Sequence, residues 1–188
     1  WAGAAIAGPK SRDMLSKLYP DLDVSNDALP FMGYKEAEFF GVPSRIFRIS
    51  FSGELAYEIN VKSDHGMFMW EKMMEVGKEF GNQPYGTEAL STLRIEMGHV
   101  AGPELDGRTI PSDVSLNGLV SKKKDFIGKN SLGREAFNVE SRQKIVGLIP
   151  IDRKSSIPEG SHIVQDQNAK LPNPKLGHVS SSCWSVEN

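Results

Sequence analysis

Residues 49–61, with the sequence ISFSGELAYEINV, constrain the fold of this chain more than any other segment. Their second half alternates strictly: Leu55, Tyr57, Ile59 and Val61 on one side, and Ala56, Glu58 and Asn60 on the other. A period of two is typical of a β-strand that buries one face and leaves the other open. We therefore expect a strand here, with the carboxylate of Glu58 on its less apolar face.

A bend precedes this strand. The tripeptide Ser52-Gly53-Glu54 predicts a turn or bulge, because Gly adopts backbone angles that other residues avoid. The bend places a second carboxylate, that of Glu54, next to the strand. From residue chemistry alone Glu58 has two interpretations: a solvated charge on an edge strand, or an acceptor that faces a ligand.

Read as a motif, SGELAYEI (residues 52–59) resembles the Y-T-G-E-x-G-F/Y-E-I signature of the glycine-cleavage T-protein family, the folate-dependent aminomethyltransferases. The longer run RISFSGELAYEINV is most similar to the sarcosine oxidase alpha-chain branch of that family. The resemblance implies that Glu58 holds the pterin ring of tetrahydrofolate, with Glu54 as a second candidate. Phe51 stands where the signature has Tyr, so the role of that hydroxyl does not carry over.

Residues 87–97 predict a helix that begins at Thr87 and stops at Gly98, with Leu90, Leu93 and Met97 on one face. Arg94 borders this face, and its chemistry alone predicts a surface cation or a partner in a helical ion pair. The run YGTEALSTLRIEMGH (residues 85–99) resembles the second family signature, D-x-L-R-L-E-x-G. That resemblance implies that Arg94 reaches the bound folate.

The remaining periodicities predict an α+β fold. A helix after Ser63 has an apolar stripe that we assign to Met67, Trp70, Met74 and Gly77. Other expected elements are strands at 1–7, 35–40, 45–51, 144–150, 161–165 and 176–181, and a helix at 10–18. We expect a T-protein-like mixed α/β domain over residues 1–141, followed by an incomplete antiparallel β-barrel over residues 142–188.

Two loop segments carry further predictions. Residues 99–113 lack periodicity and read as a long ordered loop, and AGPELDGRT (residues 101–109) is similar to the sarcosine oxidase alpha branch. The lysines at 122–124 are typical either of a clamp for phosphate or the folate tail, or of a solvated basic turn. We expect Phe126 and Ile127 to anchor the chain before a helix that Ser131 caps.

Composition excludes several classes. A net charge of −2 argues against nucleic acid or an anionic membrane as partner, and no apolar run approaches the ~20 residues that span a bilayer. One cysteine, Cys183, precludes an internal disulfide and fits a reducing compartment such as the cytoplasm. The four histidines lie far apart in sequence, so we expect no metal site.

The resemblance covers nearly the whole chain but only the C-terminal part of the parent protein, so we expect a fragment. It implies that the catalytic Asp precedes Trp1 and that FAD, FMN and NAD bind elsewhere in the complex; we expect no catalytic residue here. The implied function is to accept the one-carbon unit of oxidised sarcosine, giving 5,10-methylenetetrahydrofolate and glycine. Reduced folate and other sarcosine oxidase subunits are the implied partners. The alternatives are a folate-free assembly module and a true aminomethyltransferase.

Overall fold

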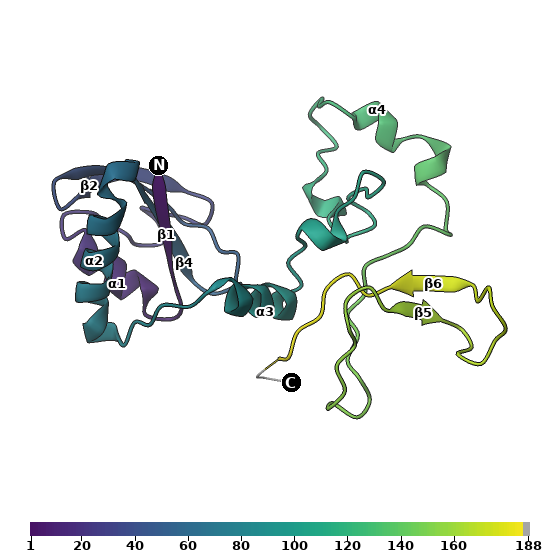
Figure 1. Cartoon of the computed structure of the whole chain (residues 1–188). Helices are drawn as coiled ribbons and strands as arrows, with labels where there is room; N and C mark the ends of the chain where they lie inside the picture. The colour runs from purple at the N-terminus through teal and green to yellow at the C-terminus, as the bar shows by residue number, and fades with distance from the viewer. Residues whose placement is uncertain (186–188) are drawn as a thin grey trace. The chain divides into compact units, whose positions relative to one another are not determined.

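The computed structural model describes residues 1–185, and the chain divides into two compact units, Trp1–Met97 and Gly98–Asn188 (Figure 1). The predicted domain boundary after residue 141 falls inside the second unit and remains a prediction. Besides the main elements, the chain forms short 3₁₀ helices at Ser63–His65, Lys78–Phe80, Gly102–Glu104, Asn117–Leu119 and Glu135–Phe137.

The first unit is built on a four-stranded antiparallel sheet in the order β1-β4-β3-β2. The strands are β1 Ala2–Ala7, β2 Tyr34–Phe39, β3 Val42–Phe47 and β4 Ala56–Val61. The predicted alternation in β4 is confirmed, because Tyr57, Ile59 and Val61 are fully buried. Its neighbours on both sides, β1 and β3, make β4 an interior strand, so the interpretation of Glu58 as an edge-strand charge is wrong.

Strands β2 and β3 form a tight hairpin, in which only Phe40 and Gly41 separate the paired residues Phe39 and Val42. Both linking residues have positive φ, 49° and 82°, as the two-residue turns that match strand twist require. The second strand was expected to begin at Arg45, but β3 begins three residues earlier, with Val42 and Pro43. Pro43 is tolerated because pairing with β4 starts one residue later.

Helices α1 (Ser11–Leu18) and α2 (Gly66–Gly77) pack on one face of the sheet (Figure 1). The core between helices and sheet includes Met14, Leu15, Leu18, Phe39, Ile46, Tyr57, Ile59, Val61, Met69 and Met73. Burial on this scale is the dominant stabilising term for a domain of this size. The opposite face of the sheet carries the alternate residues, including Glu58.

The predicted apolar stripe of α2 is confirmed at Gly77 but wrong at its first two positions. The buried residues are Met69, Met73 and Gly77, whereas Met67 and Trp70 are 70% and 44% exposed. Apolar side chains occupy so many positions of this helix that two different stripes satisfy the helical period. The contact with the sheet selects one, since a Cβ on Gly66 would lie 2.7 Å from the Cβ of Ala2.

Helix α3 (Thr87–Met97) ends before Gly98, whose φ of 77° confirms the predicted stop. Its buried side chain is not one of the predicted apolar residues but Arg94, which is only 6% exposed. Met97, predicted to be on the apolar face, is 57% exposed. The interpretation of Arg94 as a surface cation is therefore wrong.

The second unit contains the short helix α4 (Lys129–Leu132) and a two-stranded antiparallel sheet of β5 (His162–Val164) and β6 (Lys175–His178). The described residues of this unit form no barrel, and residues 144–150, expected to be a strand, pair with no neighbouring strand. Ile145 instead donates its backbone N–H to the Asp113 carbonyl at 2.7 Å. The sequence pattern specified extended chain there, but not a strand partner.

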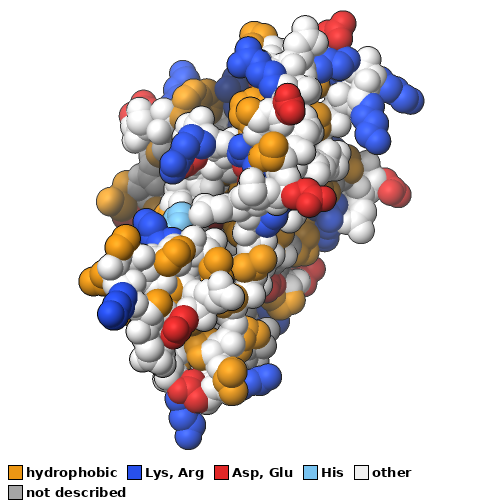
Figure 2. All heavy atoms as spheres, turned by 90° about the vertical axis from the view of Figure 1, so that its right-hand side faces the viewer, with side chains coloured by type: hydrophobic (Ala, Val, Ile, Leu, Met, Phe, Trp, Pro, Cys, Tyr) orange, Lys and Arg blue, Asp and Glu red, His pale blue; other side chains and the backbone are white. Residues whose placement is uncertain are grey.

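Few of the described side chains of the second unit are shielded from solvent. Asp113 and Val114 are its buried residues among those described, and Ile127 is fully exposed, so the predicted anchor at this residue is wrong. Ser131 lies inside α4 rather than capping it. Figure 2 shows hydrophobic side chains scattered among Lys and Arg side chains over the face that it presents.

Candidate functional site

Glu58 occupies the middle of β4, on the sheet face opposite the two helices. The register places Ala5 of β1 on one side of it and Phe47 of β3 on the other. The Glu58 side chain is half-buried, and within residues 1–185 no hydrogen bond or ion pair involves it. An ionised carboxylate offers only acceptors, so this position presents acceptor oxygens on the open face of the sheet.

The neighbours of Glu58 on this face differ between the two flanking strands. On the β1 side they are small, and a Cβ on Gly3 would lie 2.7 Å from Oδ1 of Asn60, so the Asn60 carboxamide lies directly over Gly3. On the β3 side they are large, and Phe47 stacks with Tyr34 at a centroid separation of 5.9 Å. On this open face, the two polar side chains of β4, Glu58 and Asn60, therefore lie between small residues on β1 and large aromatic residues on the β3 side.

The bend before β4 lies against α3. Gly53 has φ of 87°, and a Cβ at this position would come within 2.9 Å of the Met97 sulfur. Met97 follows Arg94 by about one helical turn. The structure thus brings together the two segments that carry the family signatures, although nothing in their sequence spacing required it.

The other side of the bend is held by the start of α1. The Leu55 carbonyl accepts two hydrogen bonds, from the Gly8 N–H at 2.9 Å and from the buried Ser11 hydroxyl at 2.8 Å. A carbonyl that accepts twice is fully satisfied, which fixes the point where the bend passes into β4. The position of Glu58 along the strand is therefore determined by contacts on both sides of the motif.

The three predicted site residues have different surroundings. Glu58 is half-buried on the sheet, and Arg94 is buried and interacts with other groups of the protein. A buried guanidinium needs such partners, because an unpaired charge is costly to bury. Glu54 is exposed at the bend, where its N–H donates to the Ser52 hydroxyl at 3.4 Å, and it lies outside β4, which begins at Ala56.

One polar cluster in the second unit was not predicted from the sequence. Asp113 is 9% exposed and accepts hydrogen bonds from the Arg142 guanidinium, with Nε at 2.9 Å, and from the Ile110 N–H at 3.0 Å. The hydrogen bonds from Arg142, outweighing the effect of burial, lower the pKa of Asp113 to about 2. Lys144 Nζ lies 3.6 Å from the same carboxylate.

This cluster explains why the predicted loop at 99–113 is ordered. Arg142 also donates to the Arg108 carbonyl at 2.8 Å, so one guanidinium joins two points of the loop to a distant segment. A charged triad spread over such a sequence distance has no local signature. A spacing rule of the kind used for helical ion pairs does not detect it.

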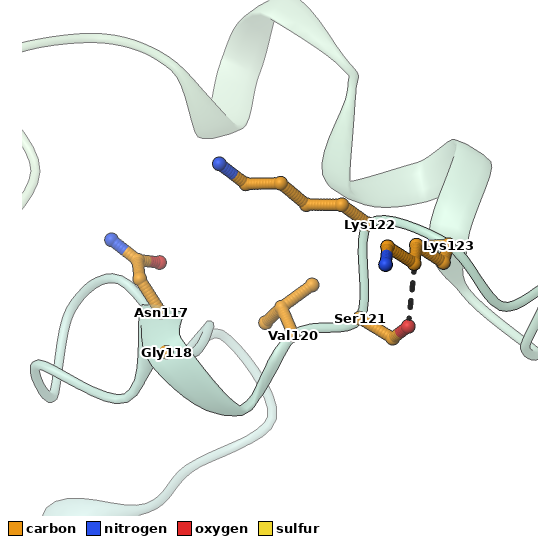
Figure 3. A pocket seen from close by; sticks show the side chains of 6 residues that line it. All are labelled: Asn117, Gly118, Val120, Ser121, Lys122 and Lys123. Carbon is orange, nitrogen blue, oxygen red and sulfur yellow. Dashed lines mark hydrogen bonds between the residues drawn. The ribbon is translucent and has the colours of Figure 1, made fainter.

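Two cavities lined by described residues have volumes of about 350 and 580 Å³, and neither includes Glu54, Glu58 or Arg94. The smaller lies beside Trp1 and Arg45, and the larger in the 117–123 segment (Figure 3). Within residues 1–185, no three His, Cys, Asp or Glu side chains are arranged to hold a metal ion. No helix in that range is long and apolar enough to cross a membrane.

The first unit is thus an α+β domain whose antiparallel sheet carries Glu58 on the face away from the core. A family model described as GCVT N-terminal domain matches residues 1–124. The chain belongs to this family, which confirms the resemblance to glycine-cleavage T-proteins drawn from the two motifs.

The chain is similar to longer curated proteins. It is 44% identical over 188 residues to "Sarcosine oxidase subunit alpha" of Rhizobium meliloti (strain 1021), covering 98% of this chain and 19% of that protein. The protein of the same name from Corynebacterium sp. (strain P-1) is 43% identical over 185 residues, covering 96% and 19%. "Aminomethyltransferase" of Chloroherpeton thalassium is 34% identical over 183 residues, covering 96% and 48%. The chain therefore spans about a fifth of the sarcosine oxidase subunits and about half of the aminomethyltransferase.

Proposed function

We propose that the first unit forms part of a tetrahydrofolate-binding site in a sarcosine oxidase alpha subunit. The observation that carries the proposal is the Glu58 carboxylate, which lies unpaired among residues 1–185 on the open face of an interior strand. Its motif segment lies against the helix that carries Arg94, the second family position. Sarcosine oxidase alpha subunits are also more similar to the chain than the aminomethyltransferases are, at 43–44% against 34% identity.

The chemistry of Glu58 fits the ligand. The pyrimidine edge of a reduced pterin presents two parallel donors, the ring N3–H and the 2-amino group. An ionised carboxylate accepts both at once, in the geometry that makes carboxylate–guanidinium pairs strong. Arg94 has five N–H donors, so it can keep its protein partners and still donate to a ligand. When bound, tetrahydrofolate supplies the N5 and N10 atoms that accept a one-carbon unit.

In this proposal the protein supplies orientation rather than a reacting group. Sarcosine is oxidised at a flavin elsewhere in a complex that holds FAD, FMN and NAD, with other subunits as partners. The one-carbon unit leaves as 5,10-methylenetetrahydrofolate, together with glycine. The 188 residues alone do not oxidise sarcosine, and the single cysteine, Cys183, agrees with a cytoplasmic location.

Replacing Glu58 with Gln tests the proposal directly. The change preserves shape but turns one acceptor into a donor that faces a donor of the pterin. We expect the affinity for tetrahydrofolate to fall by about ten- to a hundredfold, or about 1.5–3 kcal/mol, the scale for a hydrogen bond to a charged group. Anaerobic titration calorimetry on the full-length protein measures this, with thermal unfolding to verify the fold.

Two matched controls accompany this variant. Glu38→Gln makes the same charge change at an exposed position of β2, and we expect it to bind folate nearly as the parent does. Glu54→Gln makes the change at the bend, and we expect it to weaken binding less than Glu58→Gln. Equal affinity in Glu58→Gln and the parent would remove Glu58 from the site. If the parent itself does not bind folate, the alternative of a folate-free assembly module is supported. The presence of Phe51 where the family signature has Tyr favours that alternative.

A further inference from the structure

The segment 117–123 curls around a cavity of about 580 Å³ lined by Asn117, Gly118, Val120, Ser121, Lys122 and Lys123 (Figure 3). Hydrogen bonds within the segment hold this shape. Val120 donates its N–H to the Asn117 carbonyl at 3.1 Å, and the Ser121 hydroxyl oxygen accepts the N–H groups of Lys123 at 3.3 Å and Lys124 at 3.0 Å. The cavity is therefore an open hollow on the surface, formed by an ordered double turn.

No described side chain neutralises the charges on this cavity. Within residues 1–185, neither Lys122 nor Lys123 forms an ion pair, whereas Lys129 lies 3.0 Å from Asp125 and Lys144 lies 3.6 Å from Asp113. The overall net charge of −2 shows that this local excess of positive charge does not follow from a basic composition. Two neighbouring cations without a counter-charge repel each other, and a bound anion would relieve that repulsion.

The positions of the side chains favour a ligand with several acceptor atoms. Figure 3 shows the Lys122 side chain extending over the pocket toward the side where Asn117 lies, while Lys123 stays beside Ser121. Both ammonium groups only donate, and the Asn117 amide and Ser121 hydroxyl can also donate. Lysine binds anions as a point charge and tolerates carboxylate and phosphate alike, so the lining defines a charge class rather than one molecule.

We infer that the 117–123 pocket binds small polyanions that carry adjacent carboxylate or phosphate groups. The sequence alone left the lysine run open between an anion clamp and a solvated turn. The cavity, the ordered turn and the lack of a counter-charge on Lys122 and Lys123 among the described residues favour the clamp. The inference does not depend on folate binding at Glu58, which lies in the other unit.

Titration calorimetry of the full chain at low salt with two separate probes, tripolyphosphate and triglutamate, tests the inference. For a probe that binds the parent, we expect the double variant Lys122→Gln/Lys123→Gln to have an affinity at least about tenfold lower. The control double variant Lys170→Gln/Lys175→Gln removes the same charge from two exposed lysines elsewhere in the unit, and we expect a change of less than about twofold.

Each result of these titrations either supports or overturns the inference. If only tripolyphosphate binds, the pocket is a phosphate site, and if only triglutamate binds, it is a carboxylate site. Either result supports the site, provided that Lys122→Gln/Lys123→Gln loses affinity and the control double variant does not. Equal losses in the two double variants would show a general effect of charge and overturn the inference. If neither tripolyphosphate nor triglutamate binds, the inference is overturned as well. All four lysines are exposed, so the variants are expected to retain the fold, which circular dichroism verifies.

Discussion

Gly53 has two functions at the bend of the motif. Its φ of 87° is in a region that L-residues avoid, and its missing side chain leaves the space that Met97 occupies. The glycine therefore determines both the direction in which the chain enters β4 and the contact between the two signature segments. Gly3 makes room in a similar way, beneath the Asn60 carboxamide.

Gly53→Ala is expected to destabilise the first unit by about 1–3 kcal/mol, the cost of a residue held in a sparsely populated backbone region. The added methyl group must also displace the Met97 side chain, so folate affinity should fall with stability. Urea unfolding measures the first effect. Gly107→Ala, at a position with open space around it, is the control. Unchanged stability in Gly53→Ala would mean that the bend relaxes without cost.

Arg94→Lys tests whether the buried guanidinium itself serves the ligand. Lys keeps the charge but loses the planar set of donors, so we expect weaker tetrahydrofolate binding in the full-length protein. Reduction of the flavin by sarcosine should stay near normal, because the proposed function assigns that step to another part of the complex. Comparison of the two measurements separates a local effect from misfolding. Equal folate affinity in both proteins would restrict Arg94 to a structural role.

Among elements, the loop at 99–113 is ordered by charge rather than by a hydrophobic core. Arg142 binds both the Asp113 carboxylate and the Arg108 carbonyl, and Ile145 donates to the Asp113 carbonyl. The hydrogen bonds from Arg142 hold the pKa of Asp113 at about 2, below its ordinary 3.8. A carboxyl with a lowered folded-state pKa stabilises the fold above its ordinary pKa, and that stabilisation is lost as the pH falls toward the lowered value.

Asp113→Asn should therefore reduce the stability of the second unit at neutral pH and flatten its dependence on pH. The parent is expected to lose the contribution as the pH falls from the ordinary value of 3.8 toward about 2, while the variant lacks it throughout. Amide exchange of Ile145, recorded across this pH range, reports on the hydrogen bond from the Ile145 N–H to the Asp113 carbonyl. Asp21→Asn, at an exposed position, controls for general charge. Identical pH profiles in the parent and Asp113→Asn would contradict the argument.

At the scale of the whole molecule, the two units differ in what stabilises them. The first has a core between sheet and helices, whereas Asp113 and Val114 are the buried residues among those described in the second. Local opening is easiest where few apolar contacts must be broken. The second unit should therefore be the less protected part of this chain.

Hydrogen–deuterium exchange checks this difference. We expect amides of β4, such as Ile59 between two partner strands, to exchange at least about a hundredfold more slowly than amides of β5. The hairpin amides of β2 and β3 serve as an internal reference for paired strands of the first unit. Comparable protection in β4 and β5 would mean that the second unit is stabilised by more than the described contacts.

The sequence alone determined much of the first unit. Alternation specified β4, glycine specified the bend at Gly53 and the end of α3 at Gly98, and two motifs specified the family. These features are local, because backbone freedom and side-chain periodicity act over a few residues. The same local reasoning misplaced the start of the buried stripe of α2, since Met67, Met69, Met73 and Met74 satisfy one helical period in more than one way.

Tertiary structure decided what depends on partners distant in sequence. It made β4 an interior strand, which gives Glu58 an open face instead of an edge, and it buried Arg94 where helix periodicity predicted the border of an apolar face. It paired Asp113 with Arg142, and among the described residues it left 144–150 without a strand partner. Burial and pairing are properties of two segments together, and a pattern read along one segment does not contain the other.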